Sequence, residues 1–292
     1  MLELAVSPRG PYSLRLSAAR ASDATRRCAG DRVVALFRVE GGLEWAGARQ
    51  RPDGWVELQA MSEAGLERLR FMLALDDDHT PFLRRFSDDP LLGGAVRFLR
   101  GLRPARVGTV THALLRAVCG QLIEARRARM IERRVVQALE EEAWGLHAPP
   151  TPATLGRPAP AELQRFGLSA RKAATLVRLC RTVDLERLTG LETAAVATRL
   201  ERERGLGPWS VGVVFLEGLG RYDRGLVGDL GLIKLCSALY GRRADAADTE
   251  ELLAPYGEWG GLASVYLLGG FARGLLPIPA GGRRRARTRV AA

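Results

Sequence analysis

Residues 200–239 read LERERGLGPWSVGVVFLEGLGRYDRGLVGDLGLIKLCSAL and decide the fold that the sequence predicts. A short turn, Gly205–Pro208, follows the helix-forming residues Ala194–Arg204. Apolar residues recur at helical spacing after the turn, so a second helix is expected to begin near Trp209. A tight Gly-x-Gly turn between two helices exposes backbone N–H groups at the positive end of the second helix dipole, where a phosphate binds well. An ordinary interhelix turn explains the same pattern equally well.

Asp229 stands directly before the next apolar stripe, which contains Leu232, Leu235, Cys236 and Leu239. Their spacing predicts a helix, and an aspartate in this position is expected to cap its N-terminus. A capping carboxylate can also face a cleft. The pattern therefore leaves open both a structural and a chemical role for Asp229.

These two features, in this order, resemble the helix–hairpin–helix DNA glycosylase superfamily. The segments LGPWSV and GDLGLIK are most similar to its DNA-3-methyladenine glycosylase II branch, which acts in alkylation repair. Four other segments resemble that branch in the same order, and they read DDDHTPFLRRFSDDPLLGGAVRFLRGLRP (76–104), HALLRAVCGQLIEARRAR (112–129), FGLSARKAATLVRLCR (166–181) and YGEWGGLASVYLLGGFARG (256–274). The likeness covers most of residues 76–276 and, weakly, the segment before them.

The resemblance implies a mainly α fold, with a helix–hairpin–helix glycosylase core in two lobes after a small α+β domain with an antiparallel sheet. We expect the α+β domain at residues 1–75 and the helical core at residues 76–276. The lobes of the core are expected at residues 104–221 and at residues 76–103 plus 222–276. Residues 277–292 are expected to form a basic, disordered tail.

Local patterns in the first domain agree with this division. β-branched residues at Arg32–Val39, followed by Gly41–Gly42, predict a β-hairpin. The alternation from Tyr12 to Leu16 is typical of a strand, and Ser62–Leu75 has helical periodicity. We expect this domain to brace the helical core and to carry no chemistry.

Two segments of the helical part carry further expectations. Apolar residues from Leu114 to Ile123, including Leu122, form a stripe that is expected to be buried. The proline-rich segment Pro149–Pro160 is expected to be a loop.

Composition points to a nucleic-acid partner. The 292-residue chain has a formal net charge of +11, which favours a polyanion such as DNA. No stretch is apolar for long enough to span a bilayer, and the first residues lack a signal-peptide pattern. Four widely spaced cysteines without a Cys-x-x-Cys pair argue against zinc, and the cysteine cluster of the iron–sulfur glycosylases is absent. We expect a monomer without a cofactor, located in a bacterial cytoplasm and associated with the nucleoid.

By resemblance, Asp229 is the catalytic carboxylate. An alkylated purine such as 3-methyladenine carries positive charge, so its glycosidic bond is already weak. A single carboxylate can stabilise the oxocarbenium-like sugar as that bond breaks, and it can guide water to the anomeric carbon. Asp223 lies six residues earlier, in the preceding loop, and is the competing candidate.

Trp209 occupies the position after the hairpin where glycosylases that also cut the strand carry a lysine. The two lysines of the chain, Lys172 and Lys234, lie elsewhere, so a monofunctional glycosylase without lyase activity is expected. The resemblance implies that Trp209 stacks on the flipped base, which gains cation–π attraction when the base is cationic. The alternative role is that of a core anchor for the hairpin.

Two pocket positions depart from the family pattern. The branch usually has a second aromatic residue four positions after the hairpin tryptophan and a third on the last helix, and these positions match Val213 and Leu268. Without their π faces the pocket is expected to be wider and to admit other alkylated bases. Tyr266 is the alternative aromatic if the register differs.

The remaining site residues concern DNA. Gly205, Gly207 and Ser210 are expected to face a phosphate at the hairpin. Base extrusion leaves a hole in the stack that an apolar side chain usually fills. Two residues in sequence, Leu102 and Arg103, match the wedge region of the branch, and Leu102 is favoured as the wedge, with packing against the hairpin as its alternative.

Two further possibilities complete the expectations. In relatives, backbone carbonyls corresponding to Arg204 and Leu206 hold a monovalent cation, and no side-chain metal ligand is expected here. A non-catalytic helix–hairpin–helix DNA-binding protein is the main alternative function. Such a module needs neither Trp209 nor Asp229.

Overall fold

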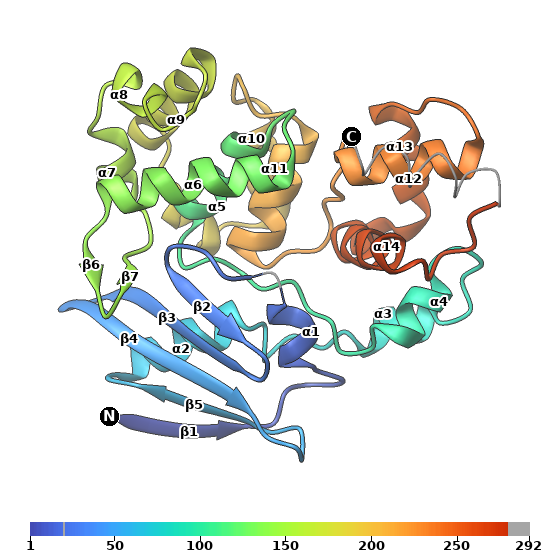
Figure 1. Ribbon diagram of the computed structural model, residues 1–292, viewed down its shortest axis with the longest axis horizontal. Coiled ribbons are helices and arrows are strands. Elements are labelled where there is room, and N and C mark those ends of the chain that lie inside the picture. Colours follow the sequence, from blue (N-terminus) through green and yellow to red (C-terminus); the bar gives the residue numbers. More distant parts are fainter. Residues whose placement is uncertain (20, 280–292) are drawn as a thin grey trace.

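A computed structural model describes residues 1–19 and 21–279. The first part is an antiparallel sheet of five strands in the order β1-β5-β4-β3-β2 (Figure 1). Its elements are β1 (Leu2–Val6), α1 (Leu14–Ala18), β2 (Arg26–Ala29), β3 (Arg32–Val39), β4 (Gly42–Gln50), β5 (Val56–Ala60) and α2 (Glu63–Met72). The expected β-hairpin and the expected helix after residue 62 are both present.

Alternation along the strands explains how this layer holds together. Val33, Ala35 and Phe37 on β3 are buried on one face of the sheet, and Leu66 and Leu69 of α2 belong to the same core cluster. The expected strand at residues 12–16 is wrong. Instead, the Ser13 hydroxyl accepts a hydrogen bond from the Leu16 amide and starts the short helix α1.

The second part is almost entirely helical. Its elements are α3 (Thr80–Phe86), α4 (Gly93–Phe98), α5 (Val110–Gly120), α6 (Ala125–Leu139), β6 (Glu142–Ala143), β7 (Leu146–His147), α7 (Pro152–Gly156), α8 (Pro160–Gln164), α9 (Ala170–Thr182), η1 (Glu186–Gly190), α10 (Thr193–Glu201), α11 (Pro208–Val213), η2 (Val214–Leu219), α12 (Leu230–Tyr240), α13 (Ala246–Leu253), η3 (Ala254–Trp259) and α14 (Gly260–Arg273).

Figure 1 shows these helices in two groups, one above the sheet and one to its right. One group contains α5–α11, and the other contains α3, α4 and α12–α14. The chain passes between the groups at residues 100–109 and again at 220–229. The second passage ends at Asp229, directly before α12, and the side chain of Asp229 contacts Trp209 of the first group.

One local expectation in this part was wrong, and one short hairpin was not predicted. The segment expected to be a proline-rich loop contains α7, because Thr151 and Thr154 form a reciprocal cap and Pro152 suits the first helical turn. A short hairpin, β6–β7, interrupts the helical part, and its Leu146 packs on Leu36 of the sheet. The local sequence pattern does not predict this contact between the sheet and the helical part.

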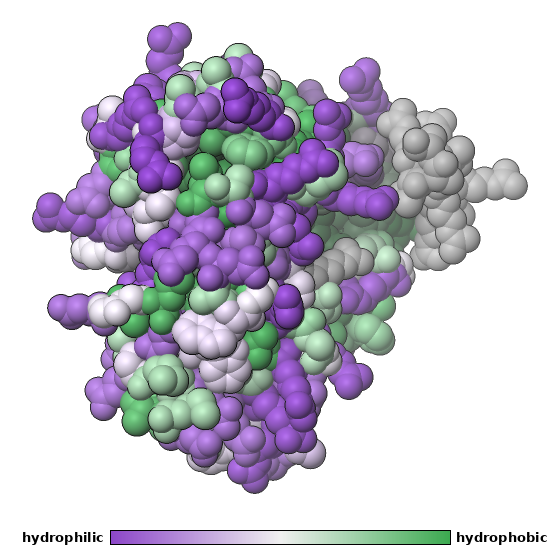
Figure 2. Space-filling view, turned by 60° about the vertical axis from the view of Figure 1, so that its left-hand side comes forward, coloured by the Kyte–Doolittle hydropathy of each residue, from purple (hydrophilic) through white to green (hydrophobic). Residues whose placement is uncertain are grey.

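None of the helices in the described residues is both long and apolar enough to cross a membrane. Figure 2 shows the side of the molecule that lies to the left in Figure 1; hydrophilic side chains dominate it, and apolar side chains form separate patches. The expected disordered tail at residues 277–292 lies outside the described residues from position 280 onward.

Candidate functional site

The predicted hairpin joins α10 to α11. Gly205 has φ of +93°, and a Cβ there would lie 2.7 Å from the side chain of Thr175 on α9, so only glycine fits. Gly207 is the extended N-cap of α11 and lies in open space, with Pro208 at the first helical position. η2 continues directly from α11, so the exposed turn stands at the N-terminus of a two-part helix, as an anion site requires.

Ser210 contributes to this turn in a different way from that expected. Its side chain is buried, and its hydroxyl accepts a hydrogen bond from the Gln121 amide at 3.0 Å. The same Gln121 nitrogen donates to the carbonyl of Gly205 at 2.8 Å. The Ser210 hydroxyl thus holds the hairpin internally, and only its backbone N–H is left for a phosphate.

Asp229 caps α12, as expected. Its Oδ1 accepts from the amides of Gly231 at 2.7 Å and Leu232 at 3.2 Å, and its Oδ2 accepts from Trp209 Nε1 at 3.0 Å. The residue is only partly buried. The carboxylate is therefore fixed in orientation by three N–H donors and still reaches the surface beside the hairpin. Asp223 has a different role, since its carboxylate pairs with the neighbouring Arg224 at 3.2 Å.

Trp209 lies between the hairpin and Asp229. Its indole ring packs against the end of α5, where a Cβ on Gly120 would come within 2.4 Å of the ring. The ring is partly exposed and also touches the main core. The packing role of Trp209 is confirmed, and its stacking on a flipped base stays a prediction.

The two positions expected in the pocket, Val213 and Leu268, differ in their exposure. Leu268 of α14 is partly exposed, and its Cδ2 lies 2.5 Å from where a Cβ on Gly231 would sit, so it covers the first turn of α12 next to Asp229. Val213 is 5% exposed and belongs to the core, so its expected place on an open pocket wall is wrong. Tyr266 is fully buried, and its hydroxyl donates to the carbonyls of Leu99 and Leu102, which excludes it as the alternative aromatic wall.

Arg103 is wrongly assigned as a DNA contact. Its side chain is fully buried, and its guanidinium donates to four backbone carbonyls, those of Arg9, Pro11, Ala74 and Leu75. It fastens the first domain to the segment that leads into the helical part. Leu102 is partly buried and packs near Gly269 of α14, so its wedge role stays a prediction.

Leu122 also lies elsewhere than its sequence pattern predicts. It was expected in a buried stripe, yet its side chain is 92% exposed and its φ is +57°. α5 ends at Gly120, so Leu122 sits on the loop before α6 rather than on a helix face. A left-handed leucine with an exposed apolar side chain is costly, and such strain gathers at functional sites. The only available sequence signal was Gly120-Gln121, a weak indication of a helix end.

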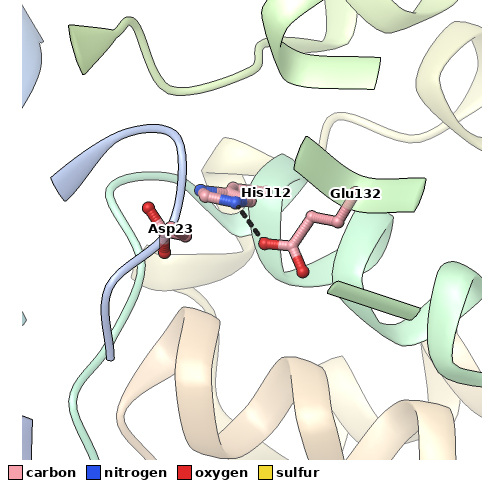
Figure 3. Close-up of side chains that lie close together, drawn as sticks. All are labelled: Asp23, His112 and Glu132. Carbon is pink, nitrogen blue, oxygen red and sulfur yellow. Dashed lines mark hydrogen bonds and ion pairs between the residues drawn. The ribbon is translucent and has the colours of Figure 1, made fainter. Parts of the chain in front are cut away.

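A cluster of possible metal ligands lies elsewhere. Figure 3 shows Asp23 from the first domain beside His112 of α5 and Glu132 of α6, and their ligand atoms lie within 4.8 Å of one another. Arg116 already places its guanidinium there, at 2.8 Å from Asp23 and 2.7 Å from Glu132. Burial alone would raise the pKa of Glu132, but Arg116 and His112 lower it to about 2. The residues form a buried ion-pair network that joins the first domain to the helices.

Comparisons with known proteins found relatives by sequence and by fold. No protein-family model matches the chain. It is 26% identical over 204 residues to the DNA-3-methyladenine glycosylase of Bacillus subtilis (strain 168), covering 66% of this chain and 67% of that protein. The 3-methyladenine DNA glycosylase of Archaeoglobus fulgidus superposes with a TM-score of 0.75 at 21% identity, covering 92% of this chain and 98% of that one.

A second solved structure has the same fold. The Clostridium acetobutylicum 8-oxoguanine glycosylase/lyase in its apo form superposes with a TM-score of 0.72 at 17% identity, covering 91% of this chain and 95% of that one. At this identity the likeness concerns the fold. Together these comparisons show that the chain has the fold of the helix–hairpin–helix DNA glycosylases and is similar in sequence to a DNA-3-methyladenine glycosylase.

Proposed function

We propose that the chain is a monofunctional DNA glycosylase that extrudes alkylated bases from double-stranded DNA and hydrolyses their N-glycosidic bond. The observation that carries the proposal is the hydrogen bond from Trp209 to Asp229 beside the Gly205–Pro208 hairpin. A binding module needs the hairpin alone. An aromatic face and an oriented, partly exposed carboxylate next to it are what base excision requires.

The hairpin supplies the phosphate contact. Its exposed N–H groups and the helix dipole favour a backbone phosphate near Gly207, which lies in open space. A phosphate held there fixes the DNA relative to Asp229. The net charge of +11 adds general attraction to the duplex.

Leu122 is the side chain that we assign to the space vacated by the flipped base. It is apolar, 92% exposed and attached to the loop that Gln121 ties to the hairpin. Leu102 is half-buried against α14 and would have to leave its packing to enter DNA. An apolar wedge between bases offsets part of the cost of unstacking them.

Asp229 then acts on the sugar. Positive charge develops on the sugar as the bond to a cationic base breaks, and a preorganised carboxylate stabilises it without reorienting. Two backbone amides hold Oδ1 and the indole N–H holds Oδ2, so the group cannot rotate away. The same carboxylate orients the attacking water.

We infer the absence of strand cleavage from the positions of the two lysines. Lys172 donates to the carbonyls of Cys119 and Gln121, and Lys234 is exposed on α12 beyond the capping turn. Trp209 occupies the place next to the hairpin. No Schiff base with the sugar is therefore proposed.

The residues expected to line the base pocket suggest which substrates the protein accepts. With Val213 in the core and Leu268 beside Asp229, Trp209 alone supplies an aromatic face among these three residues. We propose that recognition depends on positive charge and on weak glycosidic bonds more than on stacking from two sides. Several alkylated bases should then be excised.

The test uses duplexes that carry single alkylated bases of several kinds, with an 8-oxoguanine duplex alongside. Strand breaks that appear only after alkali treatment, from several alkylated bases, support the proposal. Breaks without alkali, or an adduct trapped by borohydride, would show a lyase instead. Duplex binding without any base release would leave only a DNA-binding module.

A further inference from the structure

Lys172, one of two lysines in the sequence, forms hydrogen bonds with the C-terminal end of α5. The chain uses lysine at only two of its 44 Lys and Arg positions. The ammonium of Lys172 on α9 donates to the carbonyl of Gln121 at 2.7 Å and to that of Cys119 at 3.1 Å. Cys119 lies in the last turn of α5 and Gln121 is its C-cap, where acceptors lack helical partners and a positive charge is favoured.

The chemistry of the ammonium suits this place. Its three donors point tetrahedrally and can satisfy two converging carbonyls, whereas a planar guanidinium is larger and presents its donors in a flat fork. The side chain is partly buried, and burial lowers the pKa of Lys172. The ammonium of Lys172 therefore donates to the two carbonyls rather than only to water.

The same helix also supports the hairpin. Thr175 lies one turn after Lys172 on α9, and its side chain sits against Gly205. Gln121 completes the link, because its backbone carbonyl binds Lys172 while its side-chain amide binds Gly205 and Ser210. The Leu122 loop and the hairpin are thus fixed to one platform and to each other.

Leu122 needs such support. Its left-handed backbone persists only where the surroundings determine it. We propose that Lys172 is a positioning residue for base extrusion, which holds the Leu122 loop at a fixed place relative to the phosphate-binding hairpin. The inference rests on the proposed glycosylase function, and it concerns the extrusion step rather than bond cleavage.

The experiment compares duplex DNA with single-stranded DNA that carries the same alkylated base, under single-turnover conditions. Extrusion is needed only in the duplex. Lys172→Met should lower the duplex rate by about tenfold or more, from the loss of two charge-assisted hydrogen bonds, and leave the single-strand rate nearly unchanged. A fluorescent base analogue beside the lesion should report less unstacking in the same variant.

Two comparisons make the result specific. Lys234→Met removes the other lysine, exposed on α12, and should leave the ratio of duplex to single-strand rates unchanged. In a Leu122→Ala background, Lys172→Met should cause little further loss, because the side chain it positions is already gone. Lys172→Arg keeps the charge and should recover part of the duplex rate, and it carries the test if the methionine variant fails to fold.

Equal losses on both DNA forms, or an unchanged ratio in Lys172→Met, would overturn the positioning role. Absence of excision by the unmodified protein on both forms would instead overturn the proposed function. In that case the fluorescence signal still decides whether Lys172 supports unstacking of the duplex.

Discussion

Trp209 donates its indole N–H to Oδ2 of Asp229 over 3.0 Å, and the two residues come from different groups of helices. Trp209 belongs to α11 after the hairpin, and Asp229 caps α12. The hydrogen bond therefore connects the expected phosphate contact with the expected catalytic carboxylate. The indole N–H thus orients the carboxylate of Asp229.

Replacing Trp209 by phenylalanine separates these two tasks. The ring face is kept and the N–H is lost, so Oδ2 loses its only side-chain donor among the described residues. A hydrogen bond to a charged group contributes about 1.5–3 kcal/mol, which predicts a single-turnover rate about tenfold to a hundredfold lower, with DNA affinity nearly unchanged. A Trp209→Phe rate equal to that of the unmodified protein would show that the bond has no part in excision.

Gly207 and Gly205 should respond differently to substitution. A side chain on Gly207 meets nothing within 4 Å in the protein, so Gly207→Val should fold normally but hold the phosphate away. Binding to all sequences should weaken alike, and the slope of log affinity against log salt should become shallower by about 1. Gly205→Val is the contrasting variant, because the clash with Thr175 and the positive φ should lower the melting temperature. Sequence-dependent losses in Gly207→Val would argue against a phosphate contact.

Leu122 and Leu102 compete for the wedge role. Leu122→Ala removes an exposed side chain and should slow excision from duplex DNA by about tenfold without altering thermal stability, since burial energy is not involved. Leu102→Ala should instead lower stability modestly, because that side chain packs on the core. Measuring single-turnover rates and melting temperatures for both variants separates the roles. Slower excision in Leu102→Ala alone would return the wedge to Leu102.

The Glu132 network predicts a pH-dependent stability. Its carboxyl has a folded pKa of about 2 against an ordinary value of 4.5, so its contribution is complete above pH 4.5 and is lost as the pH falls toward 2. Glu132→Gln leaves buried Arg116 and His112 without this partner and should cost about 3 kcal/mol at pH 7.

Denaturant unfolding measured between pH 7 and pH 3 checks this prediction. The difference between the unmodified protein and Glu132→Gln should shrink as the pH falls. Glu142→Gln, an exposed carboxylate on β6, serves as the matched control and should change little. A constant difference across this range would show that ionisation of Glu132 does not contribute.

The sequence predicted what depends on local chemistry. Gly205 has a left-handed backbone that favours glycine, and Asp229 caps the start of a helix, so both left local signals that the structure confirms. The link between Trp209 and Asp229 left none, because it joins residues from two groups of helices.

Other misassignments have the same origin. Arg103 reads as a surface cation, but four carbonyls from distant segments receive it in the interior. Leu122 follows a helical stripe, but α5 ends two residues before it. Both errors arise where tertiary structure overrides local periodicity, and Leu122 is the one that alters the account of the site.

The central claim is that the carboxylate of Asp229 drives base release. The most direct measurement is the single-turnover release of an alkylated base from duplex DNA, with affinity for the same duplex measured in parallel. Asp229→Asn keeps the side chain's shape and one oxygen for capping, and it should lower the rate by about a thousandfold while binding persists. Turnover by Asp229→Asn close to that of the unmodified protein would contradict the claim.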